Sequence, residues 1–219
     1  MSLWSYLIPR TLVHTTSRYN QDIRVIEEWG VRRLLVNGSR QSGPSIQVLW
    51  ESALEAFPHP ELLKKPSILV LGVGGGTVMG LLAKRYNKPR ITAVDIDATI
   101  IAIAKQFFGL DRIPSIRFVV QDAKDYIDSV PAHMYDVVVI DLFIGRIIPS
   151  FVSSPAFYKA LKHCMTPRGI LLINYLQELD YQKKSDALRK TLIRSFRDVH
   201  DFPISNNRFF FARQSKLIE

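Results

Sequence analysis

The chain has 219 residues and a net charge of +9, with 47% hydrophobic and 22% charged residues. This composition is ordinary for a globular protein, and the length suffices for one main domain with a small appendage. No apolar run approaches the ~18 residues of a membrane span, and residues 1–10 lack a basic n-region, so we expect no membrane segment and no secretory signal. Cys164 is the single cysteine, which excludes an intrachain disulfide framework and favours a cytoplasmic location.

The positive charge is spread along the chain and forms no basic tail. Such a surface can attract nucleic acid or another polyanion, but an ordinary solvated basic surface explains it as well, and we expect no nucleic-acid partner. The same charge disfavours a polycationic substrate. The five histidines show no metal-ligand spacing and have no cysteine partner, so we expect no metal site.

Residues 1–58 predict a small N-terminal unit made of a β-hairpin and a helix. Two short β-prone runs are separated and followed by turn signals at Gly30 and Asn37-Gly38. An amphipathic segment then ends before Pro58. The predicted elements are antiparallel strands within 22–30 and 31–38, a helix over 47–57, and a linker-like stretch over 59–66.

From residue 67 to 219, strands alternate with helices, which predicts an α/β domain with helices on both faces of a mostly parallel sheet. Expected strands are 68–72, 91–95, 116–120, 136–141, 170–175, 199–204 and 208–213, and expected helices are 76–86, 97–108, 123–129, 154–164 and 180–196. The last two strands are joined by too few residues for a crossover, so they should pair antiparallel. Seven strands with this closing pair match a Rossmann-like, class I methyltransferase-type domain.

The segment from Ile68 to Thr77 reads as a buried strand, a glycine turn and the start of a helix. Glycines without a Cβ let the backbone turn sharply and approach a ligand closely. Asp95 ends the next strand about 20 residues further on, where a carboxylate can accept hydrogen bonds from ribose hydroxyls. The pattern predicts nucleoside binding, although an α/β turn without a ligand can look the same.

Acidic residues follow the second, third and fourth strands of this domain, where open α/β sheets bind their ligands. Asp97 and Asp125 are explained equally well as helix caps. Asp122 can accept a hydrogen bond from an adenine amino group. Asp141 ends a very apolar strand, so desolvation should raise its pKa toward that of a useful base.

A base at this position is needed if an amine must lose a proton before it attacks an electrophilic carbon. The carbon next to a sulfonium, as in S-adenosylmethionine or its decarboxylated form, is such an electrophile. We therefore expect one of these as co-substrate and a small-molecule amine as acceptor, with the protein contributing mainly position.

Together with the N-terminal unit, these residues resemble the spermidine synthase (polyamine aminopropyltransferase) family over nearly the whole chain. Residues 17–25 are similar to the family's opening strand motif, and residues 35–41 to the hairpin that follows it. The resemblance implies aminopropyl transfer to an amine such as a polyamine, a homodimer, and Asp141 as the catalytic base. The co-substrate contacts it implies are Gln21, Gln41, Gly72, Gly74, Gly75, Gly76, Asp95, Ile96, Asp122 and Ala123.

The chain also departs from the family pattern on the polyamine side. Gly75 replaces an Asp that holds the amino tail of the ligand, and Ile144 replaces a second acid after Asp141. Residues 42–51 lack most of the acids that the family carries there. Burying a polyamine without carboxylates is costly. An S-adenosylmethionine-dependent methyltransferase and a non-catalytic nucleoside-binding or scaffold protein therefore stay open as alternatives.

Overall fold

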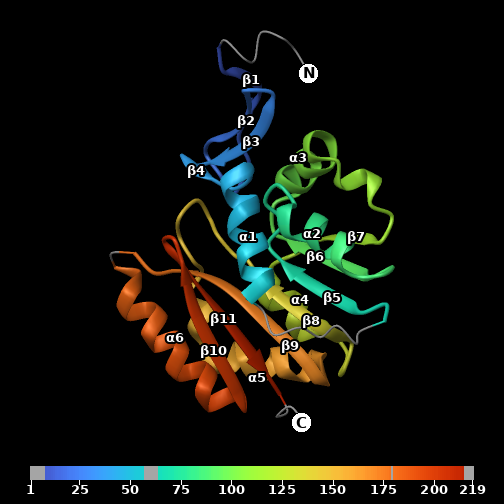
Figure 1. Cartoon of the computed structure of the whole chain (residues 1–219), viewed down its shortest axis with the longest axis vertical. Helices are drawn as coiled ribbons and strands as arrows, with labels where there is room; N and C mark the ends of the chain where they lie inside the picture. The colour runs from blue at the N-terminus through green and yellow to red at the C-terminus, as the bar shows by residue number, and fades with distance from the viewer. Residues whose placement is uncertain (1–7, 57–63, 179, 215–219) are drawn as a thin grey trace.

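The computed structural model of the chain describes residues 8–56, 64–178 and 180–214. A four-stranded sheet lies at one end of the molecule, next to a larger sheet of seven strands (Figure 1). The predicted fold class is confirmed: the larger sheet is mostly parallel, and a small antiparallel sheet precedes it.

The N-terminal sheet is an antiparallel meander whose strands follow one another in chain order. Its strands are β1 (Arg10–Thr15), β2 (Ile23–Glu28), β3 (Val31–Val36) and β4 (Ser39–Arg40). The connections Trp29-Gly30 and Asn37-Gly38 have positive φ at both residues (54° and 71°, 48° and 75°). Two-residue turns of this kind match the twist of the flanking strands, as the turn signals predicted. The strands β1 and β4 were missed, because β1 has no buried residue and β4 has only two residues.

The helix α1 (Pro44–Ala56) begins at Pro44 rather than at Gln47, because the fixed φ of proline suits the first helical turn. The helix packs against the large sheet, where the buried Trp50 ring meets Phe209 edge-on with centroids 5.3 Å apart. Phe57 and most of the predicted linker lie outside the described residues. The division of the chain near residue 58 therefore stays a prediction.

The large sheet has the strand order β10-β11-β9-β8-β5-β6-β7. Strand β11 lies between β9 and β10 and runs antiparallel to both, which confirms the predicted closing pair. Strand β9 starts before its predicted position, because Met165 already pairs with Tyr135 ahead of a register shift. The strands are β5 (Ser67–Leu71), β6 (Arg90–Asp95), β7 (Ile116–Val120), β8 (Tyr135–Ile140), β9 (Met165–Leu176), β10 (Asp198–Ile204) and β11 (Asn207–Arg213).

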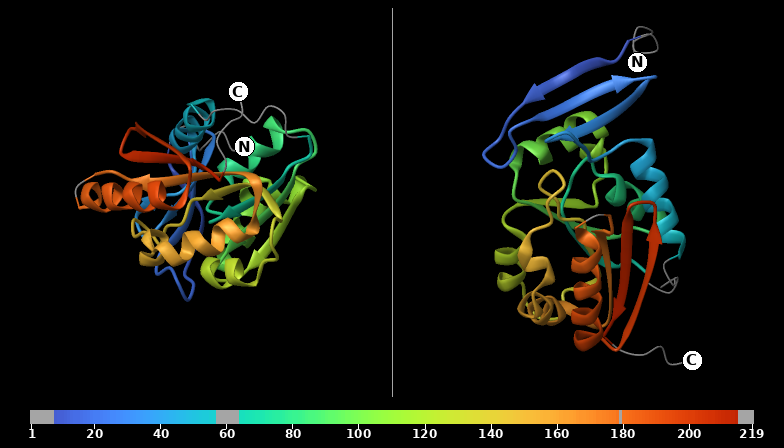
Figure 2. Two further views of the ribbon diagram at one scale, coloured as in Figure 1. Left: turned by 90° about the horizontal axis from the view of Figure 1, so that it is seen from below. Right: turned by 90° about the vertical axis from the view of Figure 1, so that its left-hand side faces the viewer.

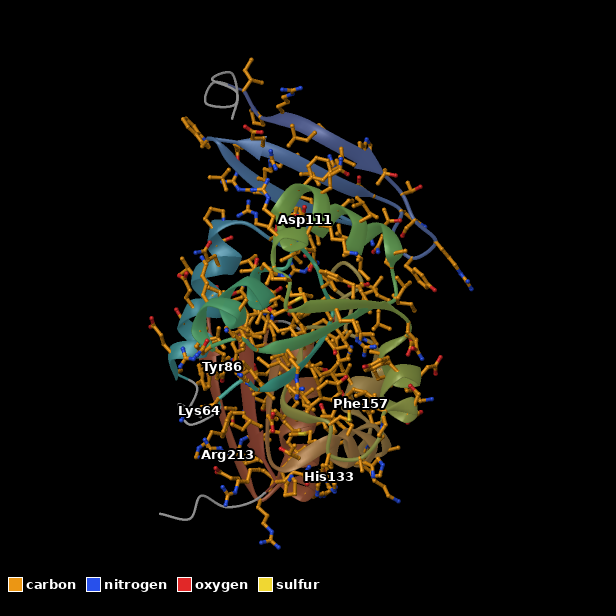
Figure 3. The ribbon with its side chains drawn as sticks, turned by 90° about the vertical axis from the view of Figure 1, so that its right-hand side faces the viewer. Lys64, Tyr86, Asp111, His133, Phe157 and Arg213 are labelled. Carbon is orange, nitrogen blue, oxygen red and sulfur yellow. The ribbon has the colours of Figure 1, made fainter. Side chains whose placement is uncertain are left out.

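Helices cover both faces of this sheet (Figure 2). Alternate strand residues face opposite layers: Ile68 packs with α1, α2 and α3, while its neighbour Leu69 packs with α4, α5 and α6. Tyr86 and Phe157, labelled in Figure 3, belong to these two opposite layers. The remaining helices are α2 (Thr77–Arg85), α3 (Ala98–Phe108), α4 (Ala123–Ser129), α5 (Pro155–Cys164) and α6 (Tyr181–Ser195), with short turns η2 (Leu110–Arg112) and η3 (Ser150–Ser153).

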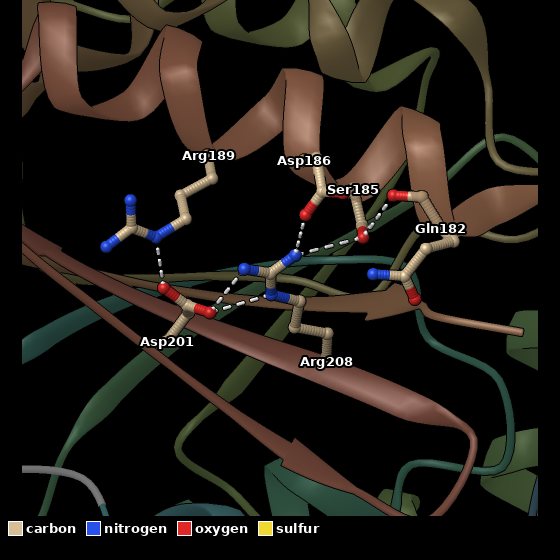
Figure 4. A network of polar contacts seen from close by, with 6 residues as sticks. All are labelled: Gln182, Ser185, Asp186, Arg189, Asp201 and Arg208. Atoms are coloured by element: carbon tan, nitrogen blue, oxygen red, sulfur yellow. Dashed lines mark hydrogen bonds and ion pairs between the residues drawn. The ribbon is translucent and has the colours of Figure 1, made fainter.

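A cluster of ion pairs ties the β10–β11 hairpin to α6 (Figure 4). Arg208 donates to Asp201 and to Asp186, each at 2.7 Å, and Arg189 donates to the second oxygen of Asp201 at 2.6 Å. Burial alone would raise the pKa of Asp201, but the two arginines outweigh it and hold the pKa below its ordinary value. The cluster therefore stabilises the antiparallel end of the sheet.

None of the helices within the described ranges combines the length and the hydropathy that crossing a bilayer requires.

Candidate functional site

The candidate site lies where the strand order reverses, between the carboxyl ends of β5 and β8, a place where open α/β sheets bind ligands. Gly72 follows β5, and Asp141 follows β8. The backbone N–H of Asp141 donates to the carbonyl of Leu71 at 2.8 Å. A Cβ on Gly72, which has a φ of 95°, would lie 2.1 Å from the carbonyl oxygen of Asp141. Only glycine therefore fits between these two strand ends.

Two cavities open at this edge of the sheet. The small cavity, about 140 Å³, lies beyond β5 and β6 and is lined by acids and the glycine loop. The large cavity, about 510 Å³, lies between α1, the loop after β8, and the ends of β9, β10 and β11. Gln41, Asp141 and Phe143 line both cavities. The predicted base therefore stands at the junction of the two spaces.

Some glycines of the loop line the small cavity, and others pack against side chains of neighbouring segments. Gly72 and Gly74 line the cavity. A Cβ on Gly76 would lie 2.3 Å from a methyl carbon of Leu110, and Gly76 precedes the first turn of α2. Gly75 is buried against Ser42. Of the four predicted glycines, two therefore face the cavity, and two permit close packing.

Asp95 is held at the end of β6 by the backbone around it. One carboxylate oxygen accepts from the N–H of Val73 and the other from the N–H of Asp97, both at 2.9 Å. Burial raises the pKa of Asp95 to about 6, against the opposing effect of these hydrogen bonds. The two carboxylate oxygens offer about four acceptor sites in all, so the carboxylate can also accept hydroxyl groups inside the small cavity.

Asp122 caps α4 and also lines the small cavity. Its Oδ1 accepts from the N–H of Lys124 at 2.8 Å. Ile96 and Ala123, the predicted contacts next to Asp95 and Asp122, line the same cavity and give it apolar walls. Carboxylates at two strand ends with apolar surface between them suit a ligand with polar edges and a flat apolar face.

Asp97 has a second role besides the helix cap that the sequence predicted. Its Oδ1 accepts from the N–H of Thr99 at 2.9 Å, as a cap does. Its Oδ2 accepts from the Ser17 hydroxyl and, at 2.8 Å, from the Asn20 amide. The buried carboxylate thus fastens the segment before β2 over the small cavity, and Tyr19 lines the cavity beside it.

The two predicted glutamines are placed differently. Gln41 lies at the junction of the cavities, where its amide donates to the carbonyl of Gly145 at 2.9 Å. Gln21 is exposed and is not among the residues that line either cavity. Its neighbour Asn20 points inward instead, because Asp97 and Asn37 both bond to its amide.

Asp141 is oriented by a chain of two amides that were not predicted from the sequence. Asn174 donates to Asp141 Oδ1 at 2.8 Å, and Asn207 donates to Asn174 Oδ1 at 2.7 Å. Burial raises the pKa of Asp141 to about 6, and the bond from Asn174 opposes part of that rise. Asn174 interrupts an apolar run at the carboxyl end of β9, a signal that was available in the sequence.

The large cavity combines an apolar wall with a balanced set of charges. Its charged lining residues are Asp141, Arg40, Arg146 and Glu178. Arg146 and Glu178 form an ion pair with each other. Its apolar wall includes Ile46, Leu49, Trp50, Phe143 and Leu176.

Ser42 occupies the space next to Gly75, the position at which the predicted resemblance implies an acid. A Cβ on Gly75 would lie 2.3 Å from the Cβ of Ser42 and 2.5 Å from its hydroxyl oxygen. Ser42 is buried, and its hydroxyl accepts from the N–H of Leu34 at 3.2 Å. The close approach of the β4–α1 connection therefore leaves no room for a side chain at position 75.

Across the parts of the chain that the structure describes, no three His, Cys, Asp or Glu side chains gather as a metal site would require.

Comparisons with known proteins agree with this architecture. Residues 68–169 match a family model described as a methyltransferase domain. The polyamine aminopropyltransferase of Vibrio vulnificus is 24% identical over 221 residues, which cover 94% of this chain and 73% of that protein.

Two solved structures share the fold. A spermidine synthase in complex with the transition-state analogue AdoDATO superimposes with a TM-score of 0.76 at 16% identity, covering 94% of this chain and 74% of that one. Human methyltransferase-like protein 13 in complex with SAH gives a TM-score of 0.66 at 24% identity, covering 79% and 83%. The predicted resemblance is confirmed: this chain is similar to curated polyamine aminopropyltransferases, and it shares the class I methyltransferase-type fold of solved spermidine synthase structures.

Proposed function

We propose that this protein is a transferase that moves an alkyl group from an S-adenosyl co-substrate in the small cavity to an amine in the large cavity. The observation that carries the proposal is the position of Asp141, which lines both cavities. A carboxylate with a pKa of about 6 is ionised at neutral pH, so it can accept a proton there.

The small cavity has the features that an S-adenosyl group requires. The proposed contacts are the glycine loop for the close approach, Asp95 for the ribose hydroxyls and Asp122 for the adenine amino group. A Cβ on Gly74 would lie 3.4 Å from the Gln41 carbonyl, so a side chain there would fill space beside the junction. When bound, the co-substrate supplies an electrophilic carbon next to a positively charged sulfur.

The chain's own residues then carry out a single displacement. Asp141 accepts the proton of the acceptor ammonium, which frees the nitrogen lone pair to form the new carbon–nitrogen bond. The carbon–sulfur bond breaks, and its electron pair stays on sulfur, which leaves as a neutral thioether. Asn174 holds one oxygen of Asp141, so the other is available for the proton. Gln41 and Phe143 border both spaces and confine the reacting groups.

Methyl transfer on the same scaffold is the second candidate. It is favoured by the Ser42 side chain, which fills the space beside Gly75 and excludes an acid that would bind an amino tail. Aminopropyl transfer needs the decarboxylated co-substrate, and methyl transfer needs S-adenosylmethionine itself.

Calorimetric titration with both co-substrates and with methylthioadenosine tests the proposal. Tighter binding of the decarboxylated form supports aminopropyl transfer, and tighter binding of S-adenosylmethionine supports methyl transfer. Binding of none of the three would refute the nucleoside site. We also propose a cytoplasmic homodimer, which sedimentation and cell fractionation would test.

A further inference from the structure

We infer that the acceptor is an amine that also carries a carboxylate, and not a polyamine. The inference rests on the proposed function, because it names the substrate class of the same large cavity. It follows from the charged residues that line this cavity, from the ion pair that two of them form, and from the apolar residues in the same lining.

Only one of the two carboxylates that line the large cavity is available for a substrate cation. Glu178 is neutralised by its ion pair with Arg146. Asp141 remains, and it receives a hydrogen bond from an uncharged amide. A single ammonium group therefore finds one anionic partner, and a second ammonium would have to compete with a guanidinium for Glu178.

Arg40 supplies an available positive charge in the same cavity. Within the described part of the chain it forms no ion pair, and its Nη1 donates to the hydroxyl of Ser45 at 3.3 Å. The other N–H groups of this guanidinium can bind a carboxylate in a bidentate manner, whereas they would repel an ammonium. Arg40 thus favours an anionic end on the acceptor.

The apolar residues that line the same cavity suit a short hydrocarbon chain on the substrate. Ile46, Leu49 and Trp50 come from α1, and Leu176 comes from β9. A chain of methylene groups buries apolar surface on such a wall without leaving a polar group unpaired. The cavity therefore matches an amine at Asp141, an apolar middle and a carboxylate at Arg40.

Three matched compounds separate the possibilities. 1,4-Diaminobutane, 4-aminobutanoate and butylamine each present an amine on the same carbon chain, and their far ends are positive, negative and uncharged. Each is titrated by calorimetry into the protein saturated with methylthioadenosine, the ligand proposed for the small cavity. We expect 4-aminobutanoate to bind at least about 10-fold more tightly than 1,4-diaminobutane, with butylamine between them.

Variants at Arg40 test the assigned contact. Arg40→Gln should weaken 4-aminobutanoate to the affinity of butylamine, and Arg40→Glu should reverse the order in favour of the diamine. The control is Arg168→Gln, which removes the same charge from an exposed arginine near the opposite end of β9 and should change none of the three affinities.

The outcomes distinguish this inference from the proposed function. If methylthioadenosine binds and the diamine binds as tightly as 4-aminobutanoate or more tightly, the inference is wrong and the nucleoside site stands. Binding of methylthioadenosine with no binding of any amine overturns the inference in the same way. If methylthioadenosine does not bind, the proposed function and the inference both fail.

Discussion

Asp141→Asn preserves the shape of the side chain at the junction of the two cavities but removes its ability to accept a proton. A positioned general base contributes about 10²–10⁴-fold to a rate, so we expect transfer to fall by that factor. In the wild type, the rate should rise with pH as Asp141 ionises, with a midpoint at about 6. Single-turnover assays that follow the thioether product measure both effects.

The same substitution should make the protein more stable at neutral pH. Burial raises the pKa of Asp141 from 3.8 to about 6, so the folded state holds this proton more tightly than the unfolded state. Wild-type stability therefore falls as pH rises between these two values, by up to about 3 kcal/mol, and this loss is complete above the folded pKa. The amide of the Asp141→Asn variant carries no charge, so urea unfolding at about pH 8 should show a gain of up to that size.

Two results would refute this reasoning about Asp141. One is a variant that retains the wild-type rate, and the other is a variant that is less stable than the wild type at about pH 8. Asp122→Asn provides the matched control, because it makes the same chemical change at a carboxylate that lines only the small cavity. It should weaken nucleoside binding while leaving the rate at saturation within a few fold of the wild type.

Three further substitutions test the packing around the site. Gly75→Ala should lower the free energy of unfolding by about 1–3 kcal/mol, because the added Cβ meets Ser42. In a double-mutant cycle, Ser42→Gly should restore most of that loss. Additive losses would contradict the contact. Asp97→Ala removes a helix cap and leaves buried donors unpaired. Chemical denaturation should therefore show a free energy of unfolding lower by about 3 kcal/mol, and calorimetry should show a weaker nucleoside affinity. Unchanged values would contradict the anchoring role. Arg208→Met should cost about 3 kcal/mol near pH 7, because it breaks a mostly buried pair. The folded pKa of Asp201 is lowered, so this pair stabilises the fold above about pH 4 and stops doing so as pH falls through the folded pKa. The free energy of unfolding of the variant should therefore depend less on acid pH than that of the wild type.

Local sequence signals determined most of the large sheet and its carboxyl edge. The apolar strands, the glycine turn and the acids at the strand ends depend on backbone geometry and on burial, which act over a few residues. For that reason the predicted strands and helices of the large domain lie close to the observed ones. The turns of the N-terminal sheet were equally readable, because Gly30 and Gly38 mark two-residue hairpins.

Tertiary structure decided which side chains meet at the site. Asp97 and Asn20 lie far apart in the chain and meet only when the segment before β2 packs against the carboxyl end of β6, so a local pattern indicates a helix cap and no anchor. Ser42 fills the space beside Gly75 for the same reason. Local sequence determined only that carboxylates stand at the carboxyl ends of β6 and β8 and at the start of α4. The amides behind Asp141, the pairing of Glu178 and the second cavity depend on contacts between distant segments, which no local pattern contains.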